Sequence, residues 1–188
     1  MTELPTTAHA ILGLLSIGPM SRYDVAACAQ SSIAHFWNIE RSQVYAELPR
    51  LEKQGLVEGT NVRQRSLPTK RVYKLTPKGR ARLVAWLEDP AIEPDRFRSE
   101  FLVKYFFGER MSPESALRLI RTYRAAAQAY VAELDRIGEA VRQAGESEFA
   151  RGTAVYGREL YEAAVQWTDG AERFVQRTAR KERSHPAS

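Results

Sequence analysis

Positively charged side chains are the most concentrated chemical groups in this sequence. Between residues 63 and 82 the chain carries eight Lys or Arg residues and no Asp or Glu. These residues are Arg63, Arg65, Lys70, Arg71, Lys74, Lys78, Arg80 and Arg82. Lysine and arginine donate charge-assisted hydrogen bonds to phosphate oxygens, so a cluster without balancing acids suits a polyanion. The run therefore indicates a surface for nucleic acid or another acidic partner.

A second polar group lies just before this run, on a predicted helix over residues 40–54. At about 100° per residue, Val44, Leu48 and Leu51 share one face, which must be the core side. The opposite side is small, polar and basic. It carries Ser42, Gln43, Tyr45, Ala46, Pro49, Arg50 and Lys53.

The residue types on this polar face suit the reading of DNA. Small side chains at Ser42 and Ala46 allow a close approach to base edges, and Gln43 is suited to read an adenine or to act through water. Tyr45 can donate to phosphate, as can the basic side chains of Arg50 and Lys53. The alternative is a solvated face on a purely structural helix. The basic run that follows directly favours DNA.

Other kinds of chemistry find few residues to use. The single cysteine, Cys28, forms no internal disulfide, and the three histidines show no metal-ligand spacing. The sequence shows no nucleophile elbow, phosphate loop or pair of catalytic carboxylates, so we expect no enzyme, cofactor or metal. The apolar run over residues 10–17 is shorter than the ~20 residues that span a bilayer, and no Lys or Arg precedes it. We therefore expect a soluble cytoplasmic protein without membrane contact.

The elements that must position these groups form a recognisable order over residues 1–90: three helices, a two-stranded hairpin and a fourth helix. Thr6 or Thr7 is suited to cap the first helix, and Ser21 with Asp24 resembles a capping box for the second. Gly55 follows the third helix as a natural C′ residue. Thr76-Pro77 opens the fourth, whose apolar stripe we expect to be Leu83, Val84 and Leu87. This order predicts a winged helix-turn-helix domain, in which the third helix enters the major groove and the hairpin is the wing.

Residues 91–180 are predicted to form a second, helical domain, which makes the protein mainly α. A short helix spans about 96–107, and two long helices span about 113–143 and 146–180. Their apolar stripes exceed what one partner helix covers, which favours a homodimer over a hairpin packed back on the first domain. The residues expected at this interface are Leu117, Ile120, Val131, Leu134, Val141, Tyr156, Leu160 and Trp167. The polar residues 181–188 are expected to form a disordered tail.

Several segments together resemble the PadR family of transcriptional regulators. The first half matches in four segments: Ala10-Ile-Leu-Gly-Leu-Leu15, Gly18-Pro-Met-Ser-Arg-Tyr-Asp24, Ser42-Gln-Val-Tyr-Ala-Glu-Leu-Pro-Arg-Leu-Glu-Lys-Gln-Gly-Leu-Val57 and Thr69-Lys-Arg-Val-Tyr-Lys-Leu-Thr-Pro-Lys-Gly-Arg80. The second half matches the longer subfamily in Arg98-Ser-Glu-Phe-Leu-Val-Lys-Tyr-Phe-Phe107 and Tyr156-Gly-Arg-Glu-Leu-Tyr-Glu162.

The resemblance implies a repressor that binds pseudopalindromic operators as a homodimer and is released by a small aromatic or hydrophobic effector. By position it implies DNA contacts from Tyr23, Ser42, Gln43, Tyr45, Lys70 and Arg71. Two features depart from the family pattern. Pro49 stands inside the recognition helix, where it is expected to cause a kink, and the wing tip over residues 65–69 lacks a glycine.

Two questions stay open at the level of sequence. His9, Trp37 and Trp167 are candidates for an effector site, but aromatic residues in such places also serve as plain core. The function also has alternatives: a helical adaptor that binds another protein, or a winged-helix co-activator that needs no small-molecule effector.

Overall fold

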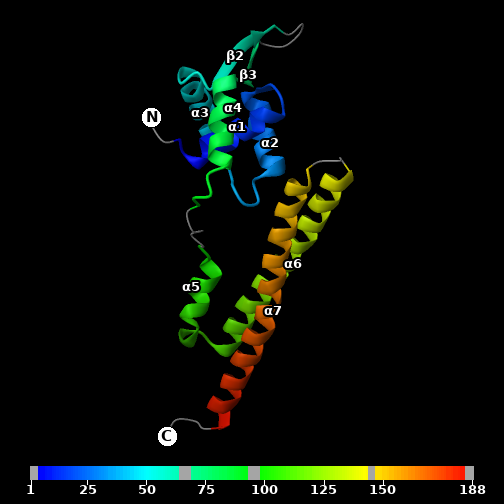
Figure 1. Ribbon diagram of the computed structural model, residues 1–188. Helices are drawn as coiled ribbons and strands as arrows, with labels where there is room; N and C mark the ends of the chain where they lie inside the picture. Colours follow the sequence, from blue (N-terminus) through cyan, green and yellow to red (C-terminus); the bar gives the residue numbers. More distant parts are fainter. Residues whose placement is uncertain (1–3, 64–68, 93–97, 144–146, 185–188) are drawn as a thin grey trace. The chain divides into compact units, whose positions relative to one another are not determined.

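The computed structural model of the chain describes residues 4–63, 69–92, 98–143 and 147–184 (Figure 1). The chain folds into two compact units, Met1–Pro94 and Asp95–Ser188. The first unit is a winged helix-turn-helix and the second consists of helices, which confirms the predicted fold class. The helices of the first unit are α1 (Thr6–Ile17), α2 (Arg22–Ser32), α3 (Arg41–Lys53) and α4 (Pro77–Leu87). Its strands are β1 (Met20–Ser21), β2 (Val57–Val62) and β3 (Lys70–Leu75).

The helix boundaries of the first unit follow local capping chemistry, with one correction. Ser21 and Asp24 form the predicted capping box of α2, and Thr76 accepts a hydrogen bond from the Gly79 amide at 3.0 Å to start α4. Gly55 has φ +70°, the left-handed conformation expected after α3. The prediction of a threonine cap on α1 is wrong, because the N-cap residue is Pro5 and no side chain caps that end.

The wing belongs to a three-stranded antiparallel sheet in the order β1-β3-β2, so the prediction of two strands was incomplete. β3 pairs with β2 from Val57–Leu75 to Val62–Lys70. On its other side β3 pairs with the two residues of β1, Met20 with Tyr73 and Ser21 with Val72. This pairing fixes the start of α2 directly against the base of the wing.

The core of the first unit lies between its helices and the sheet. Val44, Leu48 and Leu51 are fully buried, which confirms the predicted inner face of α3. On α4 the predicted apolar stripe is wrong in part. Leu83 is buried, but Val84 and Leu87 remain 43% and 65% exposed.

The second unit is built on a hairpin of two long helices that lie side by side (Figure 1). Its elements are α5 (Glu100–Phe106), the short 3-10 helix η1 (Gly108–Arg110), α6 (Pro113–Gln143) and α7 (Glu148–Ser184). The sequence predicts a disordered tail from residue 181. In the structure α7 continues to Ser184, because lysine, glutamate and arginine are good helix formers. Residues 185–188 lie outside the described part of the chain.

The buried side of the hairpin has small residues on α7, and both small and large ones on α6. The buried α7 positions are Ala154, Thr168, Ala171 and Ala179. On α6, Ile120 and Leu134 are buried within the same chain, so the prediction that they face a second copy is wrong. A Cβ on Gly157 would lie 3.2 Å from Leu134 Cδ1, which shows how closely the two helices approach at that point.

A group of hydrogen bonds and salt bridges fixes the register of α6 against α7. Arg124 of α6 donates to the Thr168 hydroxyl at 2.8 Å and pairs with Asp169 and Glu172 at 2.9 and 2.8 Å. Arg121 pairs with the same Glu172 at 2.6 Å.

No helix in the described ranges is both long and apolar enough to cross a membrane.

Candidate nucleic-acid interface

The outer face of α3 presents the side chains that the sequence assigns to DNA. Burial of Val44, Leu48 and Leu51 turns the other side of the helix outward, as the helical period requires. The exposed residues of this face are Ser42, Gln43, Tyr45, Ala46, Pro49, Arg50 and Lys53. The structure therefore brings together on one surface the α3 residues that were selected by spacing alone.

Pro49 does not interrupt α3, which runs unbroken from Arg41 to Lys53. The kink expected at Pro49 stays a prediction, because a helix can bend at a proline without losing its continuity. Because proline has no amide hydrogen, the carbonyl of Tyr45 cannot receive the usual donor from four residues later. Pro49 lies on the exposed side of the helix, where water can solvate that carbonyl.

Gln43 has a structural task in addition to its expected reading role. The backbone amide of Glu40 donates to Gln43 Oε1 at 2.9 Å, which helps to satisfy the first turn of α3. This bond uses one of the two acceptor positions of the Gln43 oxygen and leaves its amide hydrogens for another partner. A bidentate contact to adenine would therefore share the Gln43 oxygen with the Glu40 amide.

Two tyrosines on this surface each have an arginine over the ring. The Arg22 guanidinium lies 5.6 Å from the ring centre of Tyr45, and the Arg41 guanidinium lies 5.4 Å from that of Tyr23. Tyr23 and Tyr45 are 59% and 40% exposed. The sequence analysis did not select either arginine. Each is the first residue of its helix, directly after the N-cap, and this position was the signal that could have suggested them.

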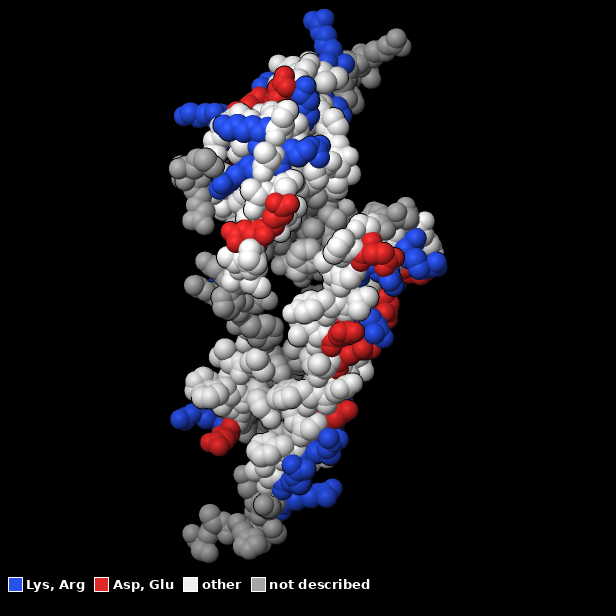
Figure 2. Space-filling view, viewed as in Figure 1, with Lys and Arg blue, Asp and Glu red and all other residues white. Residues whose placement is uncertain are grey.

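The cations of the wing are paired with acids that are distant in sequence. Lys70 lies 3.8 Å from Asp24, Arg71 lies 2.6 Å from Glu52, and Lys74 lies 3.1 Å from Glu58. Figure 2 shows blue and red side chains next to one another on the visible face of this unit. The acid-free run in the sequence is therefore partly neutralised in the fold.

Two of these acids, Glu52 and Asp24, are held in their charged form by their surroundings. The hydrogen bond from Arg71, and then that from the Gly59 amide, lower the pKa of Glu52 against the opposing effect of its burial. The hydroxyl and amide of Ser21 lower the pKa of Asp24, with a smaller contribution from Lys70. Glu52 in turn raises the pKa of Arg71.

The remaining predicted DNA contacts are less constrained. Arg50 lies 3.6 Å from Glu47 with 73% of its side chain exposed, and Lys53 and Arg63 are exposed. In the described ranges no salt bridge holds Lys53 or Arg63, so both side chains are available to phosphates. Arg65 lies outside the described residues.

The three residues considered for an effector site have separate surroundings. His9 is buried and stacks on Trp86, with ring centres 4.6 Å apart and planes 4° apart. Trp37 donates its indole N–H to the Thr7 hydroxyl at 3.2 Å. Trp167 belongs to the second unit, where it packs edge-on against Tyr105 and Phe101. Trp37 and Trp167 thus make ordinary contacts within one unit, whereas His9 is buried and neither of its ring nitrogens has a hydrogen-bond partner among the described residues.

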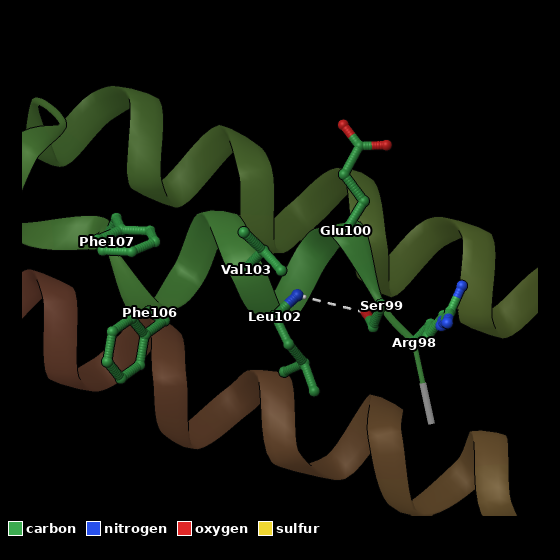
Figure 3. Close-up of a pocket in the computed structure, with 7 residues that line it drawn as sticks. All are labelled: Arg98, Ser99, Glu100, Leu102, Val103, Phe106 and Phe107. Atoms are coloured by element: carbon green, nitrogen blue, oxygen red, sulfur yellow. Dashed lines mark hydrogen bonds between the residues drawn. The ribbon is translucent and has the colours of Figure 1, made fainter. Parts of the chain in front are cut away.

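An open hollow lies on the second unit and is lined by α5 and the residues at its two ends. Figure 3 shows its lining residues, with Leu102 and Phe106 projecting to the same side of the helix and Arg98 at the other end. Phe106 is 80% exposed and Val103 is 58% exposed. Within the described ranges, no group of three or more His, Cys, Asp or Glu side chains is placed to hold a metal ion.

Comparison with known proteins matches both halves of the chain. Residues 11–85 match the model of the transcriptional regulator PadR-like family, and residues 97–175 match that of the virulence activator alpha C-terminal domain. The negative transcriptional regulator PadR of Bacillus subtilis is 31% identical over 126 residues, which cover 67% of this chain and 69% of that protein.

Solved structures agree over almost the whole chain. The B. subtilis PadR structure in complex with operator DNA matches with a TM-score of 0.82 at 25% identity, over 91% of this chain and 99% of that one. The same regulator in complex with p-coumaric acid gives 0.75 at 24% identity, over 92% and 99%. The Vibrio cholerae virulence activator AphA gives 0.69 at 27%, over 91% and 98%. With the curated relative and the family model in agreement, this chain belongs to the PadR-like family of transcriptional regulators.

Proposed function

We propose that this protein binds double-stranded DNA in a sequence-specific manner and regulates transcription from the site it binds. The observation that carries the proposal is the outer face of α3, where small and polar side chains surround the exposed Tyr45 while the core residues of the helix are fully buried. An α-helix fits the major groove of B-DNA, and the adjoining wing is suited to the flanking backbone. The operator complex of the B. subtilis relative supports this assignment. Such a regulator works where the chromosome is, in the cytoplasm.

We propose further that the protein acts as a homodimer on a pseudopalindromic operator. The support comes from α7, which leaves a line of large apolar side chains uncovered by its own chain. Tyr156, Leu160 and Phe174 are 65%, 49% and 55% exposed, spaced so that they share one side of the helix. A second copy related by a two-fold axis would cover this stripe and present α3 twice, with half-sites about one or two helical turns apart.

We also propose that the protein represses its target and is released by a small aromatic or hydrophobic molecule. The B. subtilis relative is a negative regulator, and a structure of it holds p-coumaric acid. The V. cholerae relative is an activator, so a co-activator is the competing function. A reporter gene behind the bound promoter separates the two: repression lowers its expression when the protein is present, and p-coumaric acid is the first probe for release.

The DNA-binding proposal is tested with a duplex that the protein itself selects from a random-sequence library, measured by filter binding over a series of salt concentrations. Tyr45→Ala should weaken binding to the selected duplex by about 1–3 kcal/mol and change its salt dependence little. Lys53→Ala should weaken selected and random duplexes alike. It should lower the slope of log affinity against log salt by about 2 in a dimer, since each phosphate contact contributes about 0.9.

Arg118→Ala is the matched control, because Arg118 is an exposed basic residue of α6 in the second unit. It should change neither affinity nor slope. A folded Tyr45→Ala protein with unchanged affinity for the selected duplex would contradict the role of α3. A protein that selects no duplex and shows no salt-dependent binding would favour the adaptor.

A further inference from the structure

Arg22, the first residue of α2, contacts both α3 and the wing. Its guanidinium lies 5.6 Å from the ring centre of Tyr45 on α3 and 5.8 Å from that of Tyr73 on β3. It also donates to the Tyr73 hydroxyl twice, from Nε at 3.1 Å and from Nη2 at 3.0 Å. One side chain thus contacts the recognition helix and the wing together.

Tyr73 makes a rigid anchor for this arginine. Its side chain is fully buried, and its backbone lies in the central strand of the sheet, paired with β1 on one side and β2 on the other. Two hydrogen bonds to a fixed hydroxyl restrict both the position and the plane of a guanidinium, because its donors form a rigid fork. Arg22 is therefore held in one orientation before any DNA arrives.

The contacts continue from Tyr73 into the wing. The Arg71 guanidinium lies 5.8 Å from the Tyr73 ring centre and donates to Glu52 Oε1 at 2.6 Å. The same carboxylate oxygen accepts the Gly59 amide of β2 at 2.9 Å. Glu52 belongs to α3, so the series begins and ends on the recognition helix. On the way it passes through α2 and β3, and the Gly59 amide adds a contact between Glu52 and β2.

We infer that Arg22 is a positioning residue for sequence reading: anchored on Tyr73 of the wing, it orients the Tyr45 ring on α3. The inference rests on the proposed DNA-binding function. It adds a residue that affects specificity by holding Tyr45 in place and not by contacting a base itself. A guanidinium suits this task because it stacks on an aromatic face while its edge donates hydrogen bonds. A lysine ammonium keeps the charge but has neither the plane nor the fork.

The test is a double-mutant cycle of Arg22→Lys with Tyr45→Ala, measured on two duplexes of equal length. One is the duplex selected by the wild-type protein and the other has the same base composition in scrambled order. Arg22→Lys should lower the ratio of selected to scrambled affinity about tenfold, which corresponds to 1.4 kcal/mol. Affinity for the scrambled duplex and the salt slope should stay within error of wild type. In the Tyr45→Ala background the same substitution should change the ratio less than about twofold, since coupled residues are not additive.

Arg41→Lys is the matched control, since Arg41 also lies over an exposed tyrosine of this surface but has no contact with Tyr73 among those described. Its effect should add to that of Tyr45→Ala. Tyr73→Phe provides a second route in case Arg22→Lys does not fold. It removes only the hydroxyl that anchors Arg22 and should lower the ratio in the same direction.

Three results would overturn the inference. Equal loss on both duplexes with a smaller salt slope would make Arg22 a phosphate contact. Additive effects of Arg22→Lys and Tyr45→Ala would show that Arg22 does not act through Tyr45. An unchanged ratio in both Arg22→Lys and Tyr73→Phe would leave Arg22 without a role, while the proposed function would stand if the wild type still prefers the selected duplex. If the wild type binds neither duplex, the proposed function fails and the inference fails with it.

Discussion

At the scale of single residues, His9 is the most unusual buried group of the first unit. It is only 2% exposed, and within the described part of the chain neither ring nitrogen has a hydrogen-bond partner. Its ring is covered by the indole of Trp86 at 4.6 Å. Burial, and then the positive charge of Arg82, lower the pKa of His9 below its ordinary value of 6.5.

This lowered pKa predicts that the winged-helix unit loses stability in mild acid. The folded state holds His9 neutral while the unfolded chain takes up a proton, so the His9 contribution is complete above pH 6.5 and falls as the pH drops below it toward the folded pKa. His9→Phe keeps an aromatic ring without a titrating group and should flatten the stability curve over this range. Circular dichroism melts at several pH values check this. An equal loss of stability in both proteins would exclude His9 as the cause.

Removing the charge of Glu52 is predicted to strengthen the binding of the protein to DNA of random sequence. Its carboxylate neutralises Arg71 at 2.6 Å, and its lowered pKa keeps it charged at neutral pH. Glu52→Gln keeps a hydrogen-bond acceptor but frees one positive charge on each wing. In a dimer, affinity for random duplex should rise and the salt slope should steepen by up to about 2. Lys74 has the same kind of partner in Glu58, so Glu58→Gln gives a comparison further from Arg22. An unchanged slope in Glu52→Gln would mean that Arg71 meets no phosphate.

At the scale of elements, the start of α4 is attached to the two residues that precede β2, Gly55 and Leu56. Thr76 donates its hydroxyl to the carbonyls of Gly55 and Leu56, at 2.8 and 3.0 Å. Its amide donates to the same Leu56 carbonyl at 3.1 Å. Gly79, one turn later, packs so tightly on that carbonyl that a Cβ would lie 1.9 Å from its oxygen. A side chain at this position therefore requires the backbone to move.

Gly79→Ala should destabilise the first unit by about 1–3 kcal/mol, the usual cost of overpacking a well-filled core. Gly152→Ala makes the same chemical change on α7, where nothing lies within 4 Å of the new Cβ. Since alanine favours a helix interior by about 0.8–1.0 kcal/mol over glycine, that variant should be more stable than wild type. Urea unfolding measures both. Similar stability of the two variants would show that the contact at Leu56 can relax.

Local signals explain which elements the sequence could predict. The capping groups at Ser21 and Thr76 and the glycine at position 55 act within four residues, so they define α2, α3 and α4 without knowledge of the fold. β1 has only two residues and exists because β3 lies beside it, so no local pattern indicates it. The same reason hides the pairs of Lys70 with Asp24 and Arg71 with Glu52, which join residues 46 and 19 positions apart. The candidate DNA face on α3 was predictable from its period, whereas its support from Arg22 was not.

At the scale of the whole molecule, the second unit assigns different roles to residues that look equivalent in the sequence. Leu134 and Leu160 both belong to predicted interface stripes, but Leu134 is 6% exposed inside the hairpin and Leu160 is 49% exposed on α7. The stripe was correctly identified as apolar. The spacing of the large apolar residues could not show which face of α7 packs against α6, because that face is lined by small residues such as Ala154 and Thr168.

This difference predicts opposite effects of one substitution. Leu160→Glu should yield a folded monomer near 21.3 kDa, because it puts a charge into the proposed interface and leaves the hairpin intact. Leu134→Glu should unfold the hairpin, because a buried unpaired charge costs several kcal/mol. Light scattering gives the mass and circular dichroism the helix content. A stable dimer of Leu160→Glu would place the dimer contact elsewhere.

The placement of the three tryptophans has a consequence for how this protein can be observed. Trp37 donates a hydrogen bond to Thr7, Trp86 lies flat on His9, and Trp167 stands edge-on to Tyr105. Two indoles belong to the first unit and one to the second, each with a different neighbour and polarity. Their intrinsic emission therefore contains a separate optical signal from each unit. A single unlabelled sample, with Trp167 kept or replaced by phenylalanine, can show whether DNA, a small molecule or heat acts first on the winged helix or on the helical hairpin.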